Sequence, residues 1–113
     1  MTAMFGKKKS PNELCKEWTR SLKKEMRQMD RRMRKTEYSE RKMKVELKKE
    51  AIQLCRDHDR QRYAAVRIMA KSIIQMRNQY SSLRQDKEKL NSVILELKEH
   101  CTYQKVKVRF QMI

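Results

Sequence analysis

Apolar side chains recur along this chain at steps of three and four residues, and these steps alternate from Leu22 to Leu47 and from Val66 to Cys101, as in a coiled-coil seam. The first stripe, broken by polar residues at Thr36 and Glu40, consists of Leu14, Trp18, Leu22, Met26, Met29, Met33, Met43, Leu47, Ala51 and Leu54. The second and more regular stripe consists of Val66, Met69, Ile73, Met76, Tyr80, Leu83, Lys87, Leu90, Ile94, Leu97 and Cys101. Each stripe predicts one long amphipathic helix.

The two stripes mirror each other when the chain folds back about residues 56–60. Positions whose numbers sum to 116 then lie opposite one another, so that Leu47 meets Met69 and Leu22 meets Ile94. Two unrelated helices would have no reason to share this register. We therefore predict an all-α fold, a long antiparallel helical hairpin with coiled-coil-like packing. An intermolecular zipper through the second stripe, which would make a homodimer, is the alternative.

Local signals set the boundaries of this hairpin. Residues 10–13, Ser-Pro-Asn-Glu, form a capping box with proline at the first helical position, and Asp57 or Asp59 can cap the second helix. From Lys105 to Phe110 polar and apolar residues alternate as in a strand. We predict an N-terminal tip at 1–9, the hairpin at 10–101 and an irregular tail at 102–113, which is either a break from the preceding pattern, a short edge strand or a frayed end.

Composition limits the class of protein. The 113 residues are 38% hydrophobic and 39% charged, with a formal net charge of +16 and only one Gly and one Pro. This composition suits long helices with few turns, and the positive charge favours phosphate-bearing partners. No apolar run is long enough to span a membrane and no secretory signal is evident, so we expect a cytosolic chain. The cysteines at 15, 55 and 101 are then expected to be reduced, although the register brings Cys15 and Cys101 close enough for a disulfide.

The N-terminal tip combines apolar and basic residues. Met4 and Phe5 precede the lysine run Lys7, Lys8 and Lys9. We predict that the two apolar side chains enter a lipid interface while the lysines stay at the phosphates, which makes a weak anchor that needs a second signal. A frayed terminus with an incidental phenylalanine is the alternative.

The first predicted helix extends this basic surface. Residues 1–49 hold 17 Lys and Arg against 7 Asp and Glu. The residues that we expect to contact anionic membrane are Lys16, Arg20, Lys23, Lys24 and Arg27, together with the tip. Nucleic acid is the competing partner, since basic helices neutralise backbone phosphates. The few aromatic residues are not interleaved with the basic ones, so the stacking platform of single-strand binders is missing.

No catalytic constellation is evident. Cys55 and His58 supply two possible metal ligands where a structural zinc site needs four, and His100 beside Cys101 is no better placed. We expect no enzymatic activity, no cofactor and no metal.

The sequence resembles the charged multivesicular body proteins, the ESCRT-III subunits, and within them the branch of the second and third members. The residues that carry the resemblance are Met4–Lys8, Ser10–Leu14, Glu25–Arg27, Asp30–Arg31, Lys48–Lys49 and the dense run Ala65–Lys71. The resemblance covers about residues 4–98. The chain departs from the family at the turn, where the family's glycine is replaced by the residues 56–59, Arg-Asp-His-Asp.

The resemblance implies the N-terminal hairpin of a membrane-remodelling subunit that acts peripherally on endosomal membrane. Such a subunit would co-assemble with other ESCRT-III subunits into homo- or hetero-polymers for multivesicular body sorting, vacuolar protein transport and scission. The residues that we expect at assembly contacts are Arg31, Glu37, Met69, Ile73 and Met76. Ion pairs of Arg27, Asp30, Arg31 and Glu37 within one chain are the alternative. The family's acidic half and its AAA ATPase-binding motif are not found in this sequence.

Overall fold

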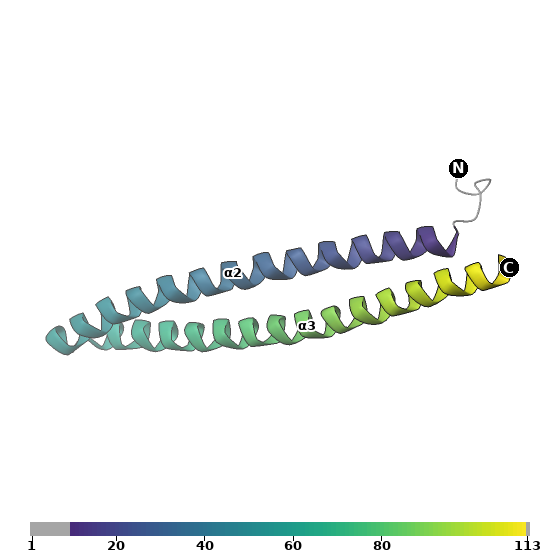
Figure 1. Cartoon of the computed structure of the whole chain (residues 1–113). Coiled ribbons are helices and arrows are strands. Elements are labelled where there is room, and N and C mark those ends of the chain that lie inside the picture. Colours follow the sequence, from purple (N-terminus) through teal and green to yellow (C-terminus); the bar gives the residue numbers. More distant parts are fainter. Residues whose placement is uncertain (1–9, 113) are drawn as a thin grey trace, which may run out of the picture. The chain divides into compact units, whose positions relative to one another are not determined.

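The structure, a computed structural model, describes residues 10–112. The order of elements is α2 (Pro11–Asp57) followed by α3 (Arg60–Met112), coloured from purple to teal and from green to yellow in Figure 1. No strand occurs in this range. The predicted all-α class with two long helices is therefore confirmed.

The start of α2 follows the predicted cap. The Glu13 amide donates a hydrogen bond to Ser10 Oγ at 3.2 Å, and the Leu14 amide donates to the Ser10 carbonyl at 3.0 Å. Pro11 is the first helical residue, where its missing N–H leaves no donor unsatisfied. Ser10 thus fixes the residue at which the chain becomes helical.

Two residues, His58 and Asp59, separate the helices. His58 has φ 50°, in the left-handed region, and its amide donates to the Leu54 carbonyl at 2.9 Å, which is the hydrogen bond of an αL helix cap. Asp59 Oδ1 accepts from the Gln61 amide at 3.0 Å and so caps α3. Of the two aspartates proposed as caps, Asp59 is the one used.

The chain divides into two compact units, and both helices pass through each of them. Unit 2 comprises residues 29–86 and contains the turn. Ile73 is buried in its seam, and two ion pairs join the helices: Arg77 Nε to Glu40 Oε1 at 2.7 Å, and Arg62 Nη1 to Glu50 Oε2 at 3.0 Å. These cross-helix contacts make unit 2 an antiparallel helical hairpin, as predicted.

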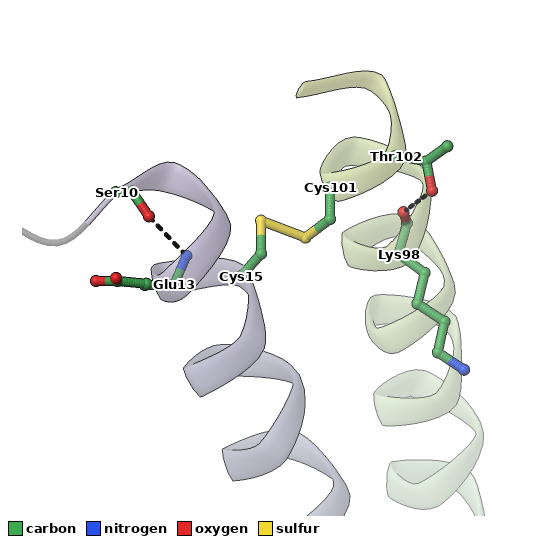
Figure 2. Close-up of a disulfide and its surroundings, with 6 residues drawn as sticks. All are labelled: Ser10, Glu13, Cys15, Lys98, Cys101 and Thr102. Atoms are coloured by element: carbon green, nitrogen blue, oxygen red, sulfur yellow. Dashed lines mark hydrogen bonds between the residues drawn. A yellow bond between two sulfur atoms is a disulfide. The ribbon is translucent and has the colours of Figure 1, made fainter. Parts of the chain in front are cut away.

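Unit 1 comprises the described residues 10–28 and 87–112. Its buried apolar residues are Cys15 and Ile94. A disulfide joins Cys15 of α2 to Cys101 of α3 with a Cα–Cα distance of 5.9 Å (Figure 2). The expectation that both thiols are reduced is therefore wrong: the helix register brings the two side chains within reach, and the structure joins them in a disulfide. Cys55 is a free, exposed thiol, as expected.

The predicted seam is correct along α3 but needs a correction at the start of α2. Every member of the second stripe is buried or half-buried, whereas Trp18 is 50% exposed. Cys15 and Thr19 take the positions assigned to Leu14 and Trp18, and they precede Leu22 by seven and three residues. The heptad spacing therefore continues to the start of α2 through Cys15 and Thr19, each of which lies one residue after the larger apolar residue predicted there.

The tail also differs from the prediction. Residues 102–112 continue α3 instead of forming an irregular segment. The apolar members of the alternating stretch, Val106, Val108 and Phe110, are exposed at 43%, 47% and 73%. A strand needs a partner for its backbone groups, whereas each residue added to an existing helix gains an internal hydrogen bond. Propagation of α3 accounts for the difference.

Candidate functional site

The basic residues predicted on the first helix form a continuous surface. Lys16, Arg20, Lys23 and Arg27 recur at steps of four, three and four along α2 of unit 1, and all four are exposed. Residues at this spacing lie on one helical face, and we call this set the basic stripe. Lys24 is also exposed and flanks it. The cationic groups of the stripe are therefore accessible from solvent.

The predicted membrane-inserting residues Met4 and Phe5, with Lys7, Lys8 and Lys9, lie outside the described residues. Their role stays a prediction. Pro11 and Asn12, the first two residues of α2, are exposed.

The five residues expected at assembly contacts fall into two groups. Arg31 and Glu37 are exposed on α2. Met69 and Met76 are half-buried and Ile73 is only 6% exposed, because these three belong to the seam within unit 2. Their role in contacts between subunits stays a prediction.

The polar interruption of the seam is an ion-pair network. The guanidinium of Arg77, which donates to Glu40 at 2.7 Å, holds the pKa of Glu40 below its ordinary value, and Lys44 Nζ at 3.3 Å acts in the same direction. Partial desolvation opposes this effect. Sequence reasoning placed Glu40 opposite Met76 and missed Arg77, the next residue.

Large apolar residues that are not part of the seam remain exposed. In unit 2, Ile52, Ile68 and Ile74 are exposed, and in unit 1, Val93 and Leu95 are exposed. Isolated exposed apolar residues are ordinary in proteins, but repeated ones on long helices are typical of surfaces that contact other molecules.

Neither a metal centre nor a membrane span is found in residues 10–112. No group of three or more His, Cys, Asp or Glu side chains is placed to hold a metal ion there. Neither α2 nor α3 contains a stretch that is both long and apolar enough to cross a bilayer.

An all-α hairpin protein with a narrow apolar seam and a strongly basic first helix is the class that these observations define. The chain is homologous to the charged multivesicular body proteins of ESCRT-III, as the sequence motifs indicated. It is 33% identical to charged multivesicular body protein 2a of Xenopus tropicalis over 97 residues, and 32% identical to charged multivesicular body protein 3 of Danio rerio over 105 residues. It is also 34% identical to vacuolar protein sorting-associated protein 2 homolog 1 of Arabidopsis thaliana over 97 residues.

These alignments cover most of this chain and less than half of each relative. They span 86%, 91% and 86% of the chain, against 41%, 44% and 40% of the three relatives in the same order. No family model matches the sequence, and no solved structure matches it. Homology is therefore established along the hairpin, and the activity of the longer proteins is carried over only as a proposal.

Sequence reasoning missed two basic residues beside the basic stripe. Lys98 and Lys105 of α3 line the same surface groove of unit 1 as Lys16, Arg20 and Lys23 of α2. The register already contained this information, because Lys98 lies one turn before Cys101 and Lys105 one turn after it. The prediction attributed the basic surface to the first helix and did not search the facing helix.

Proposed function

We propose that the chain is a structural, non-enzymatic subunit that acts with ESCRT-III proteins in multivesicular body sorting. The observation that carries this proposal is the 33% identity to charged multivesicular body protein 2a over 86% of the chain. In this proposal the hairpin binds the anionic surface of endosomal membrane from the cytosolic side and co-assembles with other subunits into filaments that remodel or sever membrane necks.

The charge of unit 1 supports the membrane part of the proposal. The basic stripe presents four exposed cations on one helical face. Each Lys or Arg near an anionic leaflet contributes about 1 kcal/mol to binding, and this contribution falls with salt. The lysines of the tip and the apolar pair Met4 and Phe5 would add to it. One copy still binds the membrane weakly. Assembly would strengthen binding, because the linked copies present many such weak contacts to the membrane at a high effective concentration.

The exposed apolar residues support the assembly part. Ile68 and Ile74 of unit 2 are exposed at 65% and 56%. Covering such side chains in a contact between copies yields roughly 1.5–3 kcal/mol for each one that becomes fully buried. Arg31 and Glu37, both exposed on α2, are available for ion pairs with a neighbouring subunit.

Sedimentation with liposomes of matched size, either anionic or neutral, tests the proposal. We expect the wild-type chain to pellet with anionic liposomes only, and we expect the Met4→Asp/Phe5→Asp variant to pellet several-fold less. Val45→Asp/Tyr63→Asp is the matched control, because it also replaces two exposed apolar residues by aspartate but lies in unit 2, at positions not assigned to assembly.

Equal loss of pelleting in both variants would show a general charge effect and would contradict insertion of the tip. Pelleting that ignores both changes and disappears when RNA is added would replace the membrane by nucleic acid as the partner. Electron microscopy of the pelleted liposomes, with and without an added ESCRT-III protein, tests filament formation separately.

A further inference from the structure

Unit 1 contains a surface groove whose lining is strongly cationic. The groove has a volume of about 540 Å³, within the range of small-molecule sites. Its charged lining residues are Lys16, Arg20 and Lys23 from α2, and Lys98 and Lys105 from α3. No carboxylate lines it, although Glu13 and Glu17 are close to it in sequence.

Five cations gathered in one groove repel one another, and the described residues form no ion pair with them that would offset the repulsion. In unit 2, by contrast, cations at the helix interface are paired with Glu40 and Glu50. A ligand that carries several negative charges would relieve the repulsion in unit 1 and replace the counterions that otherwise accumulate there.

The disulfide holds the two sides of the groove together. Cys15 and Cys101 themselves line it, and their Cα atoms are 5.9 Å apart. Figure 2 shows the bond joining α2 to α3, with Lys98 on the preceding turn of α3. Because the cations come from both helices, their separation depends on how closely the helices approach at this bond.

We propose that this groove, which we call the disulfide groove, binds a compact polyphosphate anion and does so only while the Cys15–Cys101 bond is intact. The ligand chemistry is that of several phosphate groups on a small scaffold, as in an inositol polyphosphate. The neutral side chains of Asn12 and Thr19, which also line the groove, add hydrogen-bonding groups. Lys16, Arg20 and Lys23 also belong to the basic stripe, so this inference shares a surface with the proposed function, but its test uses a soluble ligand and needs neither the tip nor a polymer.

The bond can be opened by a defined reaction. A dithiol reductant donates two electrons and two protons, the Sγ–Sγ bond breaks, Cys15 and Cys101 become thiols, and the reductant becomes a cyclic disulfide. The groove cations then remain on their helices but lose the covalent restraint on their separation.

Isothermal titration calorimetry of the full chain with inositol hexakisphosphate, at physiological salt and without vesicles, tests the proposal. We expect one site per oxidised chain. We expect Lys98→Gln/Lys105→Gln to weaken binding about tenfold or more, whereas Lys42→Gln/Lys49→Gln leaves it nearly unchanged. The control removes two exposed lysines with the same spacing of seven residues from α2 of unit 2.

The redox arm uses the same titration. We expect reduction, or the Cys15→Ser/Cys101→Ser variant, to weaken binding several-fold, and we expect Cys55→Ser to have no effect. Far-ultraviolet circular dichroism shows whether the variants remain helical, and the lysine pair tests the groove even if the cysteine variant does not fold. Equal losses in both lysine pairs, or affinity that is indifferent to reduction, would overturn the proposal.

A third arm identifies the source of the phosphates. The Met4→Asp/Phe5→Asp variant is first bound to vesicles that contain a phosphatidylinositol bisphosphate, and inositol hexakisphosphate is then added. Release of the protein from the vesicles that depends on Lys98 and Lys105 assigns a lipid headgroup to the groove. Calorimetric binding of the soluble ligand without such release of protein assigns a free anion. Failure of the proposed membrane insertion leaves the calorimetric result unaffected.

Discussion

In the two units, different interactions hold α2 and α3 together beside the heptad seam. Unit 2 has a two-residue turn and cross-helix ion pairs between guanidinium and carboxylate groups, Arg77 with Glu40 and Arg62 with Glu50. Unit 1 has a disulfide and a groove lined only by cations among its charged residues. In unit 2 the charges stabilise the pairing of the helices. In the groove of unit 1 the like charges repel one another, and a covalent bond joins the two helices.

The difference teaches that a seam of half-buried residues is sensitive to what surrounds it. Only Cys15, Ile73 and Ile94 are buried among the apolar residues that the structure describes. Such a thin core contributes little free energy per turn, so the charges and covalent links beside it decide where the two helices stay paired. The following substitutions test separately the disulfide of unit 1 and the turn and ion pair of unit 2.

Removal of the disulfide should have the largest effect. The bond joins residues separated by 86 positions in sequence, and closing a loop of this size stabilises a fold by ~4–5 kcal/mol in the chain-entropy account. We expect Cys15→Ser/Cys101→Ser to lower the free energy of unfolding by about this amount in urea titrations followed by circular dichroism. Cys55→Ser is the control, and a loss as large in this control would contradict the assignment.

A smaller effect should come from the turn of unit 2. His58 occupies a left-handed position, which glycine adopts without the steric cost of a Cβ atom. We expect His58→Gly to raise the free energy of unfolding by roughly 0.5–1 kcal/mol, measured by the same titration. Gln53→Gly, within α2, should lower it by about 1 kcal/mol. Destabilisation by both changes would show that His58 makes contacts that matter more than its backbone geometry.

The smallest effect should come from Glu40, and it should depend on pH. The pKa of Glu40 is lower in the folded chain than in the unfolded chain, so its stabilising effect is present above the unfolded value and is lost as pH falls through the folded value. Thermal unfolding of wild type and Glu40→Gln between neutral and acidic pH should give a difference that shrinks as pH falls. Glu46→Gln, which replaces an exposed glutamate on α2, is the control. A difference that grows on acidification would contradict this account.

Much of the fold could be predicted from spacing alone. The second stripe, the fold-back register and the helix start at Ser10 all follow from short-range chemistry and heptad geometry. The register even placed Cys15 opposite Cys101, but the redox state was inferred from the expected compartment and was wrong. Helical patterns fix which side chains meet. They do not fix whether two facing thiols are oxidised.

The remaining errors have physical causes. Trp18 was assigned to the seam because it is apolar, whereas Thr19 keeps the heptad step and lies there instead. The alternation after Lys105 resembles a strand, but α3 continues because an extended segment there would lack a partner. The groove lysines Lys98 and Lys105 were missed because charge was counted along one helix and not across two.

The Cys15–Cys101 bond also makes the chain a ring. The two cysteines are 86 positions apart, and the chain between them, including His58 and Asp59 of the turn, forms one covalent loop. A protease that cuts once inside this loop would linearise the ring without releasing a fragment, so the nicked molecule would keep its full mass on a non-reducing gel. The same molecule would separate into two pieces once the disulfide is reduced, and a cut in the turn would therefore be silent until then.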